Sequence, residues 1–324
     1  MGNFLIARLS QTALMLAAMS MLVFVGIYLI GDPTAIFIQP NMSPEDIEHT
    51  RRALGFDKPL WQQYWLFASA ALHGDLGTSF SYNRPALEVI LERLPATFEL
   101  ATVAMFVALV LGVPLGLMAG LRPQALTTRA VMGFSVIGFS VPGFFVALML
   151  VVIFSIELGW LPATGRGQTV ALLGVPMSVF TAEGWRHLAL PAITLALYPL
   201  SLVIRVVRAG TAENLRLDYV RFARAKGVAG HRIVLVHVLK NIAIPLITIG
   251  GLTFGTLLAF AVVTETIFAW PGMGKLLIDA INVLDRPLIV AYILVTVVIF
   301  AAINLVSDLL YAALDPRVRM ADGQ

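Results

Sequence analysis

The sequence has 324 residues, of which 59% are hydrophobic and only 13% are charged. Soluble domains carry roughly 25% charged residues, so the composition excludes an ordinary soluble enzyme and predicts a protein that crosses a membrane several times. The net charge is +3, and it comes from basic residues gathered between apolar runs, which does not indicate nucleic-acid binding. The absence of cysteine excludes disulfides, thiol catalysis and thiolate metal sites.

The first apolar run, residues 12–30, is long enough to cross a bilayer at about 1.5 Å per residue. A signal peptide is the alternative, but its apolar core is shorter, roughly 7–15 residues, and an Ala-x-Ala-like cleavage site follows it. Gly31-Asp32-Pro33 follows here instead. We therefore expect residues 1–30 to contain the N-terminus and a retained first transmembrane helix.

The largest polar segment, residues 31–97, has more acidic than basic residues, which is typical of the outer face. Ser43 and Pro44 predict a helix start, with Ser43 as N-cap, and Gly55 would end that helix. Residues 59–72 predict a second helix that Gly74 closes. Its aromatic residues are interpreted as interfacial anchors, with a ligand cage as the alternative; they are Trp61, Tyr64, Trp65 and Phe67.

Five further spans are predicted at residues 100–121, 130–158, 188–207, 242–268 and 288–312. Pro142-Gly143 breaks the third span, and we favour a kink over a helix that lines a pathway. Residues 170–180 are too short to span and predict an outer loop or an interfacial piece. Glu265 at the outer end of the fifth span either has a structural role, which we favour, or lines a cavity. The candidate pathway residues are Pro142, Tyr198, Ser201 and Glu265.

Six spans place both termini on one side of the membrane, and the basic residues agree with that side being the inner one. The segments concerned contain Arg8, Arg122 with Arg129, the loop described next, and Arg317 with Arg319.

The segment 205–245 lies between two apolar runs, and only Glu213 and Asp218 oppose its basic residues. Residues 215–226 contain no Gly or Pro and predict a short helix under the membrane. Gly227 and Gly230 interrupt it, and residues 231–241 can form a second helix. A cytoplasmic partner could dock on such a loop. The basic residues are Arg205, Arg208, Arg216, Arg221, Arg224, Lys226, Arg232 and Lys240.

The order of phrases in this loop resembles the coupling loop of ABC-importer permeases, closest to the branch that carries dipeptides, oligopeptides and nickel. The general loop begins Glu-Ala-Ala, whereas Arg221, Phe222 and Ala223 stand here, and Gly227 keeps the family's glycine. This departure from the general loop resembles the loop sequence of the peptide branch. The phrases in the loop are DYVR at 218–221, ARAKG at 223–227 and HVLKN at 237–241. Phrases elsewhere that also resemble the family are LGFDKP at 54–59, GDLGTS at 74–79, RLPAT at 93–97, GWLPATG at 159–165 and AWPGMGKL at 269–276.

The resemblance implies an all-α, polytopic inner-membrane protein of bacteria, with six transmembrane helices, the type I ABC importer permease fold and cytoplasmic termini. Its parts would be residues 1–30, a periplasmic segment 31–97, a five-helix core 98–313 with the coupling loop 209–240, and a tail 314–324. Implied partners are a homologous second permease subunit, two ATPase subunits and a periplasmic solute-binding protein. The implied ATPase-coupling residues are Asp218, Tyr219, Arg221, Ala223, Arg224, Ala225, Lys226 and Gly227.

The sequence contains no phosphate-binding loop, because Gly272-Met273-Gly274-Lys275 lacks both the spacing and the Ser or Thr of that motif. His231 and His237 are six residues apart, so they do not share one helical face, and no metal site is expected. We therefore expect a non-catalytic subunit that binds no cofactor, with ATP and Mg²⁺ on the partner ATPase.

The cargo stays open at this point. Dipeptides or oligopeptides lead, with nickel, glutathione-like peptides, opines or oligosaccharides as alternatives. A secondary transporter would need intramembrane acids or paired broken helices, and only Glu265 and Asp308 come near. A membrane sensor or scaffold that moves no cargo is the remaining alternative.

Overall fold

The computed structural model describes residues 2–29, 42–43, 45–46, 49, 52 and 57–314, with side chains for residues 10–26, 42–43, 45–46, 49, 52 and 57–310. The predicted features at Arg8, Pro44, Gly55 and residues 315–324 lie outside the described parts. The chain divides into two compact units, residues 1–92 with 279–301 and residues 93–278 with 302–324.

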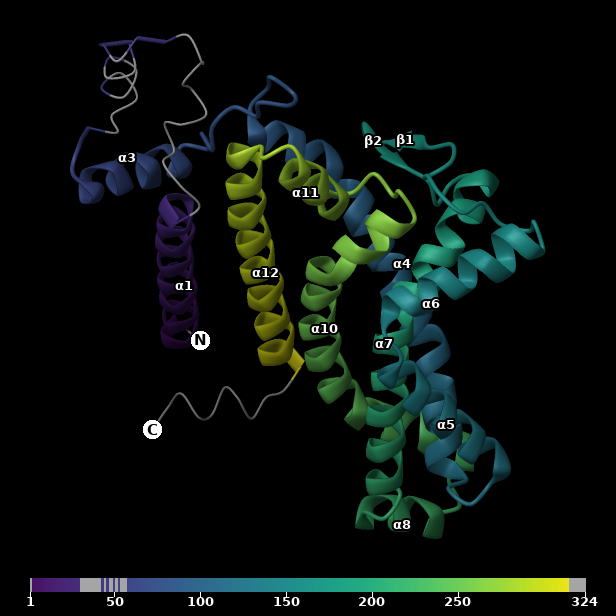
Figure 1. Ribbon diagram of the computed structural model, residues 1–324. Helices are drawn as coiled ribbons and strands as arrows, with labels where there is room; N and C mark the ends of the chain where they lie inside the picture. The colour runs from purple at the N-terminus through teal and green to yellow at the C-terminus, as the bar shows by residue number, and fades with distance from the viewer. Residues whose placement is uncertain are drawn as a thin grey trace. The chain divides into compact units, whose positions relative to one another are not determined.

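The described part of the chain is mostly helical, as predicted (Figure 1). The helices are α1 (Gly2–Leu29), α3 (Leu60–Leu72), α4 (Ala86–Leu121), α5 (Leu126–Ser140), α6 (Gly143–Leu150), α7 (Ala182–Asn214), α8 (Asp218–Ala225), α9 (Gly230–Arg232), α10 (Leu239–Ile267), α11 (Met273–Asn282) and α12 (Arg286–Leu314). Two π-helical segments, Val151–Glu157 and Ile233–Val238, continue α6 and α9. Strands β1 (Val170–Leu172) and β2 (Val175–Met177) form an antiparallel hairpin.

Four helices of the described chain are long and apolar enough to cross a membrane, or five if a bent pair counts as one span. They are Ala86–Leu121, Ala182–Asn214, Gly230–Ile267 and Arg286–Leu310, with Leu126–Ser140 plus Gly143–Glu157 as the bent pair. The first helix contains a shorter apolar stretch, Ser10–Gly26. The predicted count of six spans is therefore not confirmed as it stands.

Two span boundaries differ from the prediction. Helix α4 begins at Ala86, in the segment expected to be polar, and runs through Pro95 and Pro114. Helix α7 begins before residue 188, where Thr181 caps it by accepting a hydrogen bond from the Gly184 amide at 2.8 Å. Both helices are longer than a bilayer requires at about 1.5 Å per residue, so apolar runs alone do not mark their ends.

In the first unit, α3 packs on α1 through Tyr64, whose hydroxyl lies 2.9 Å from the Ser20 hydroxyl and whose ring meets Phe24 edge-on. Trp61 and Trp65 remain exposed, which agrees with a role as interfacial anchors. Gly74 ends the turn after α3 with φ +81°, as the sequence predicts. The predicted cap at Ser43 is also present, because its Oγ accepts from the Asp46 amide at 3.2 Å.

Asp285 fixes the start of α12 in the same unit. Its Oδ2 accepts hydrogen bonds from the Ser79 hydroxyl at 2.6 Å and the Ser81 amide at 3.0 Å, and its Oδ1 accepts from the Leu288 amide at 3.3 Å. Burial raises the pKa of Asp285, but the hydrogen bonds from Ser79 and Ser81 lower the pKa by more than burial raises it. The pKa of Asp285 therefore lies below its usual value.

In the second unit, glycines of α4 press directly against α7. A Cβ at Gly112 would lie 2.7 Å from Val203, one at Gly116 2.7 Å from Val207, and one at Gly120 2.5 Å from Thr211. The four-residue spacing places all three glycines on one helical face, which lets the two backbones approach closely. A close approach also occurs at Gly251, against Ser307, whereas Gly250 faces open space.

The helix break at Pro142 is sharper than a kink, because α5 and the helix Gly143–Glu157, which consists of α6 and its π-helical continuation, are bent by 106°. Residues 170–177, which were expected to form a loop or interfacial piece, form the β1–β2 hairpin.

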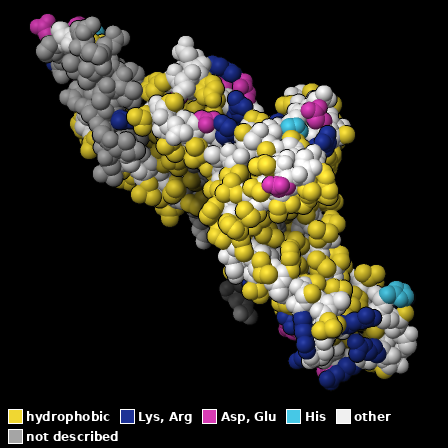
Figure 2. Space-filling view, turned by 45° about the vertical axis from the view of Figure 1, so that its right-hand side comes forward, with side chains coloured by type: hydrophobic (Ala, Val, Ile, Leu, Met, Phe, Trp, Pro, Cys, Tyr) yellow, Lys and Arg dark blue, Asp and Glu magenta, His cyan; other side chains and the backbone are white. Residues whose placement is uncertain are grey.

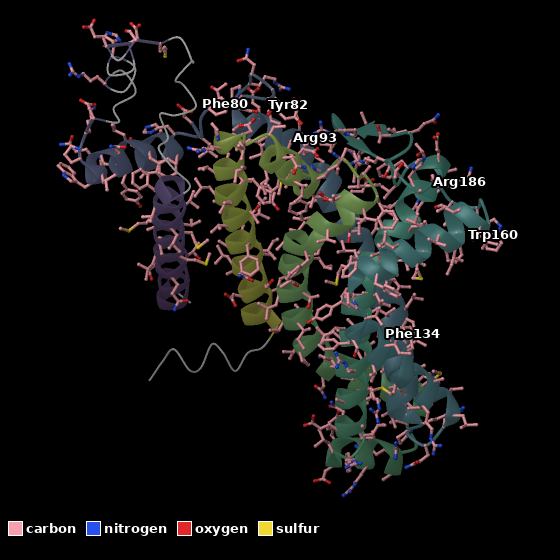
Figure 3. All side chains as sticks on the ribbon, viewed as in Figure 1. Phe80, Tyr82, Arg93, Phe134, Trp160 and Arg186 are labelled. Carbon is pink, nitrogen blue, oxygen red and sulfur yellow. The ribbon has the colours of Figure 1, made fainter. Side chains whose placement is uncertain are left out.

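The chain around this hairpin is held to α4 by Glu99, a buried carboxylate. Glu99 pairs with Arg166 and accepts from the Ser178 and Val179 amides at 2.5 and 2.8 Å. Arg186 donates to the Trp160 carbonyl nearby at 3.1 Å (Figure 3).

Candidate coupling site

Helix α8 is strongly two-sided. Val220 is fully buried, whereas Asp218 and Arg221 on the opposite side have side chains that are 96% and 71% exposed. Asp218 opens the first turn and Arg224 lies in the last, an order that favours the helix dipole. A helix of eight residues is too short to be stable alone, so its packing must hold it in place.

That packing is an apolar cluster drawn from α7, α8 and the start of the next span. Val220 lies among residues from α7 and from the segment that leads into α10. The buried members are Val203, Val207, Val220, Ile233, Val238 and Ile242, and Leu215, Tyr219, Ala223 and Val228 pack against them. Any tilt of α8 therefore changes contacts with two long helices at once.

Three polar side chains join the same elements. The Tyr219 hydroxyl donates to Asn214 Oδ1 at 2.7 Å, and Asn241 Nδ2 donates to the Tyr219 hydroxyl at 2.8 Å and to Asn214 Oδ1 at 3.2 Å. Asn214 in turn donates to the Gly210 carbonyl at 2.8 Å. We call Asn214, Tyr219 and Asn241 the polar clamp. Because it links the last residue of α7, α8 and α10, it restricts α8 more than apolar packing alone.

Gly227 ends α8 in a left-handed turn. Its φ is +77°, its amide donates to the Arg224 carbonyl at 2.9 Å, and the Val228 amide donates to the Ala223 carbonyl at 3.1 Å. These two bonds are the Schellman pattern, with glycine at the position that favours it. A Cβ there would meet nothing within 4 Å, so the backbone conformation alone requires the glycine.

The outward side of α8 combines charge with an exposed aromatic ring. Phe222 is 61% exposed, the Lys226 ammonium lies 4.5 Å from the centre of its ring, and Arg221 pairs with Asp218 at 3.4 Å. Figure 2 shows Lys and Arg side chains gathered at the lower end of the molecule, where Figure 1 places α8, beneath a hydrophobic surface. An exposed aromatic with flanking cations is typical of a protein interface.

The predicted coupling residues therefore divide between two faces. Tyr219 and Ala223 face the bundle, and the others lie on the exposed side or at the turn, namely Asp218, Arg221, Arg224, Ala225, Lys226 and Gly227. Sequence reasoning missed Asn214 and Asn241 as members of the site. Asn241 ends the phrase HVLKN at 237–241, which resembles the family, and this phrase was the sequence signal that could have identified Asn241 as part of the site.

The four predicted pathway residues do not form one site. Pro142 is exposed at the break, and Tyr198 is 47% exposed, with its ring stacked on Phe139 at 5.2 Å. Ser201 is buried where α5 meets α7: its hydroxyl donates to the Leu197 carbonyl at 2.9 Å, and the missing side chain of Gly138 leaves room for it. Ser201 therefore has a packing role in the described chain.

Glu265 caps a helix. It is fully buried, its Oε1 accepts from the Thr97 hydroxyl at 2.6 Å, and its Oε2 accepts from the Lys275 amide at 3.0 Å. Thr97 Oγ1 also accepts from the Met273 amide at 2.8 Å, so the two side chains together satisfy amides at the start of α11. This geometry supports the structural alternative for Glu265 and gives no support to its place in a pathway.

Two family models match the chain. Residues 1–101 match the N-terminal model of binding-protein-dependent transport system membrane components, and residues 112–320 match the binding-protein-dependent transport system inner membrane component. The chain belongs to this family. It is therefore an inner-membrane permease component of a binding-protein-dependent ABC importer, which confirms the resemblance seen in the coupling loop.

Relatives of the same family match over their full length. The glutathione transport system permease protein GsiC of Escherichia coli strain K12 is 38% identical over 98% of this chain and 99% of its own. The dipeptide transport system permease protein DppB of the same strain is 34% identical over the same shares. A chain of the MetNI methionine ABC transporter, solved in inward-facing conformations, aligns with TM-score 0.54 and 16% identity over 71% of this chain and 98% of its own. That last likeness concerns the fold alone.

Proposed function

We propose that this permease moves dipeptides, oligopeptides or a related small solute across the inner membrane, and that α8 couples this movement to ATP hydrolysis on partner subunits. The observation that carries the proposal is a short helix held by the polar clamp and the apolar cluster, with Phe222 and Arg221 facing outward. The relatives GsiC and DppB, which are glutathione and dipeptide permeases, support a peptide-like cargo. Nickel, opines and oligosaccharides are the alternatives within the same machinery.

The proposed assembly contains this chain, a homologous second permease subunit, two ATPase subunits and a periplasmic solute-binding protein. ATP and Mg²⁺ would bind on the ATPase, and this chain would hold no cofactor. Closure of the ATPase dimer would displace α8, and the polar clamp would pass that displacement to α7 and α10. The mechanism is a two-state element whose balance is biased by nucleotide on one side and by the loaded binding protein on the other.

Copurification tests the assembly. The chain is extracted from its native membrane in mild detergent, and the proteins that elute with it are identified by mass spectrometry. We expect an ATPase and a second permease in stoichiometric amounts, and the reconstituted assembly should take up a labelled dipeptide only when ATP is present. A chain that elutes alone, folded and without an ATPase, would contradict the proposal and would favour an ion-coupled secondary transporter.

A further inference from the structure

Arg205 directs its charge into the membrane-spanning part of α7. Its Nε donates to the carbonyl of Ser201, one turn earlier in the helix, at 3.3 Å, and its guanidinium carbon lies 4.2 Å from the centre of the Phe139 ring. An Arg near the end of a span normally extends toward the nearer interface. Here the side chain turns back toward the middle of the helix, so it does not act as an ordinary interfacial anchor.

Phe139 sets the depth of that charge. It is the residue before the last in α5, about 20 Å along the helix from Leu126 at the usual rise per residue, which is well inside an apolar layer about 30 Å thick. The α5–α6 break follows directly, and irregular backbone at membrane depth is tolerated only where protein buries it or where it lines a water-filled cavity. Pro142 and Gly143 at the break are exposed in this chain.

Tyr198, Phe139 and Arg205 stack in one row between α5 and α7, which we call the ladder. The Tyr198 ring stacks on Phe139 at 5.2 Å with 25° between planes, and Arg205 lies over Phe139. Tyr198 and Phe139 are 47% and 46% exposed, so both rings present an open edge beside the charge. In the part of the chain that the structure describes, no salt bridge joins Arg205 to a carboxylate. A half-buried cation at membrane depth without a paired carboxylate favours an anionic ligand.

We infer that Arg205, Phe139 and Tyr198 form a solute-binding site in the translocation pathway, where Arg205 binds a carboxylate of the cargo and the two rings contact its apolar part. The ligand class is a small peptide or amino-acid-like solute with a free carboxylate, because a guanidinium donates two parallel hydrogen bonds to that group. The inference rests on the proposed function. It keeps Tyr198 from the four predicted pathway residues and adds Arg205 and Phe139 to it.

The absence of cysteine from the sequence allows a direct test. Tyr198→Cys gives the chain one thiol beside Arg205 in the assembled, reconstituted importer. The thiol is reacted with a pair of membrane-impermeant methanethiosulfonates, one anionic and one cationic, and mass spectrometry of this chain measures both rates. Adding Arg205→Gln should lower the anionic-to-cationic rate ratio by about tenfold, as expected for removal of a unit charge several ångströms away. Arg216→Gln, an exposed charge elsewhere, should leave the ratio unchanged.

Ligand protection completes the test. Alanyl-alanine should slow labelling of Tyr198→Cys, its C-terminal amide should not, and Arg205→Gln should abolish the difference. A thiol that reacts with neither reagent in any nucleotide state would place lipid or the second permease over the ladder and overturn the inference. Equal protection by acid and amide, or by neither, would also overturn it. ATP-driven uptake by the importer without substitutions is measured in parallel, because its failure would refute the proposed function rather than this site.

Discussion

The hydroxyl of Tyr219 lies 2.7 Å from Asn214 Oδ1, which ties α8, in the connection between two spans, to the last residue of α7. Asn241 closes the arrangement from α10 with bonds of 2.8 and 3.2 Å. Helix α8 is thus attached to the spans on both sides of it by directional bonds. A displacement of α8 cannot be absorbed by sliding on an apolar surface, and it must reach α7 and α10.

Tyr219→Phe tests the polar clamp. The ring keeps its apolar contacts, but two hydrogen bonds are lost, each contributing about 1 kcal/mol at a partly exposed site. We expect ATP-driven uptake to fall about fivefold while ATPase activity and assembly persist, which is the result of weakened coupling. The measurement is the ratio of solute transported to ATP hydrolysed. Tyr82→Phe is the matched control, and an unchanged ratio in Tyr219→Phe would show that the clamp does not transmit motion.

Gly227→Val tests the turn after α8. A β-branched residue at φ +77° is strained by roughly 1–2 kcal/mol, and no neighbour could compensate. We expect the Val variant to insert normally and to lose most ATP-driven uptake. Gly227→Asn is the control, since asparagine adopts the left-handed conformation readily, and it should retain most of the uptake. Equal uptake by the Val variant and the unmodified chain would refute the role of the turn.

Gly116→Leu tests the contact between α4 and α7. Its Cβ would lie 2.7 Å from Val207 and 2.9 Å from the Ile204 carbonyl, so the two helices would have to separate. Overpacking of this kind costs about 1–3 kcal/mol or more, and the melting temperature in detergent should fall by several degrees. Gly133→Leu on α5 faces open space and should be neutral. Equal melting temperatures for both variants would contradict the close approach.

Thr97→Val tests the cap of α11. The variant keeps the shape of the side chain but leaves the Met273 amide and Glu265 Oε1 without the Thr97 hydroxyl. Leaving such buried groups unpaired costs about 1–3 kcal/mol. Thr97→Ser retains the hydroxyl and should stay close to the unmodified chain in thermal stability. If Val and Ser were equally stable, Glu265 would need another partner, and a pathway role would again be open.

Asp285→Asn tests the start of α12 and gives a pH dependence. The lowered pKa of Asp285 means that its carboxylate stabilises the folded chain above the unfolded value of about 4, and that this stability is lost as pH falls through the folded pKa. The variant should therefore be less stable than the unmodified chain at pH 7, by about 1–2 kcal/mol. The difference should shrink below about pH 4. A difference that does not change with pH would show that shape, and not charge, holds Ser79 and Ser81.

The sequence was most informative where a feature depends on neighbouring residues. The cap at Ser43, the turn at Gly74, helix α8 and the turn at Gly227 all follow from local chemistry, and the structure confirms them. The break at Pro142 was also predicted, but its angle was not, because the 106° bend depends on how α6 packs rather than on proline alone.

Contacts between distant residues could not be predicted. Thr97 and Glu265 are 168 residues apart, and Asn214 and Asn241 are 27 apart, so neither pairing follows from spacing along the chain. Helix α4 was predicted to begin too late, at residue 100, because residues 31–97 were assigned to a polar segment, whereas the helix begins at Ala86 and continues through Pro95. The glycines at 112, 116 and 120 carried a readable four-residue signal that was not used, whereas Arg205 was interpreted only as an inner-face charge.

The central claim is that the outward face of α8 docks on an ATPase, and site-specific photocrosslinking from Phe222 tests it most directly. A benzophenone amino acid replaces Phe222, which is 61% exposed, in cells that express the whole importer, and Phe106, 62% exposed on α4, serves as the control position. We predict an ATPase adduct from position 222, changed in yield by ATP, and none from position 106. The absence of an ATPase adduct from position 222 in an importer that still transports would contradict the account.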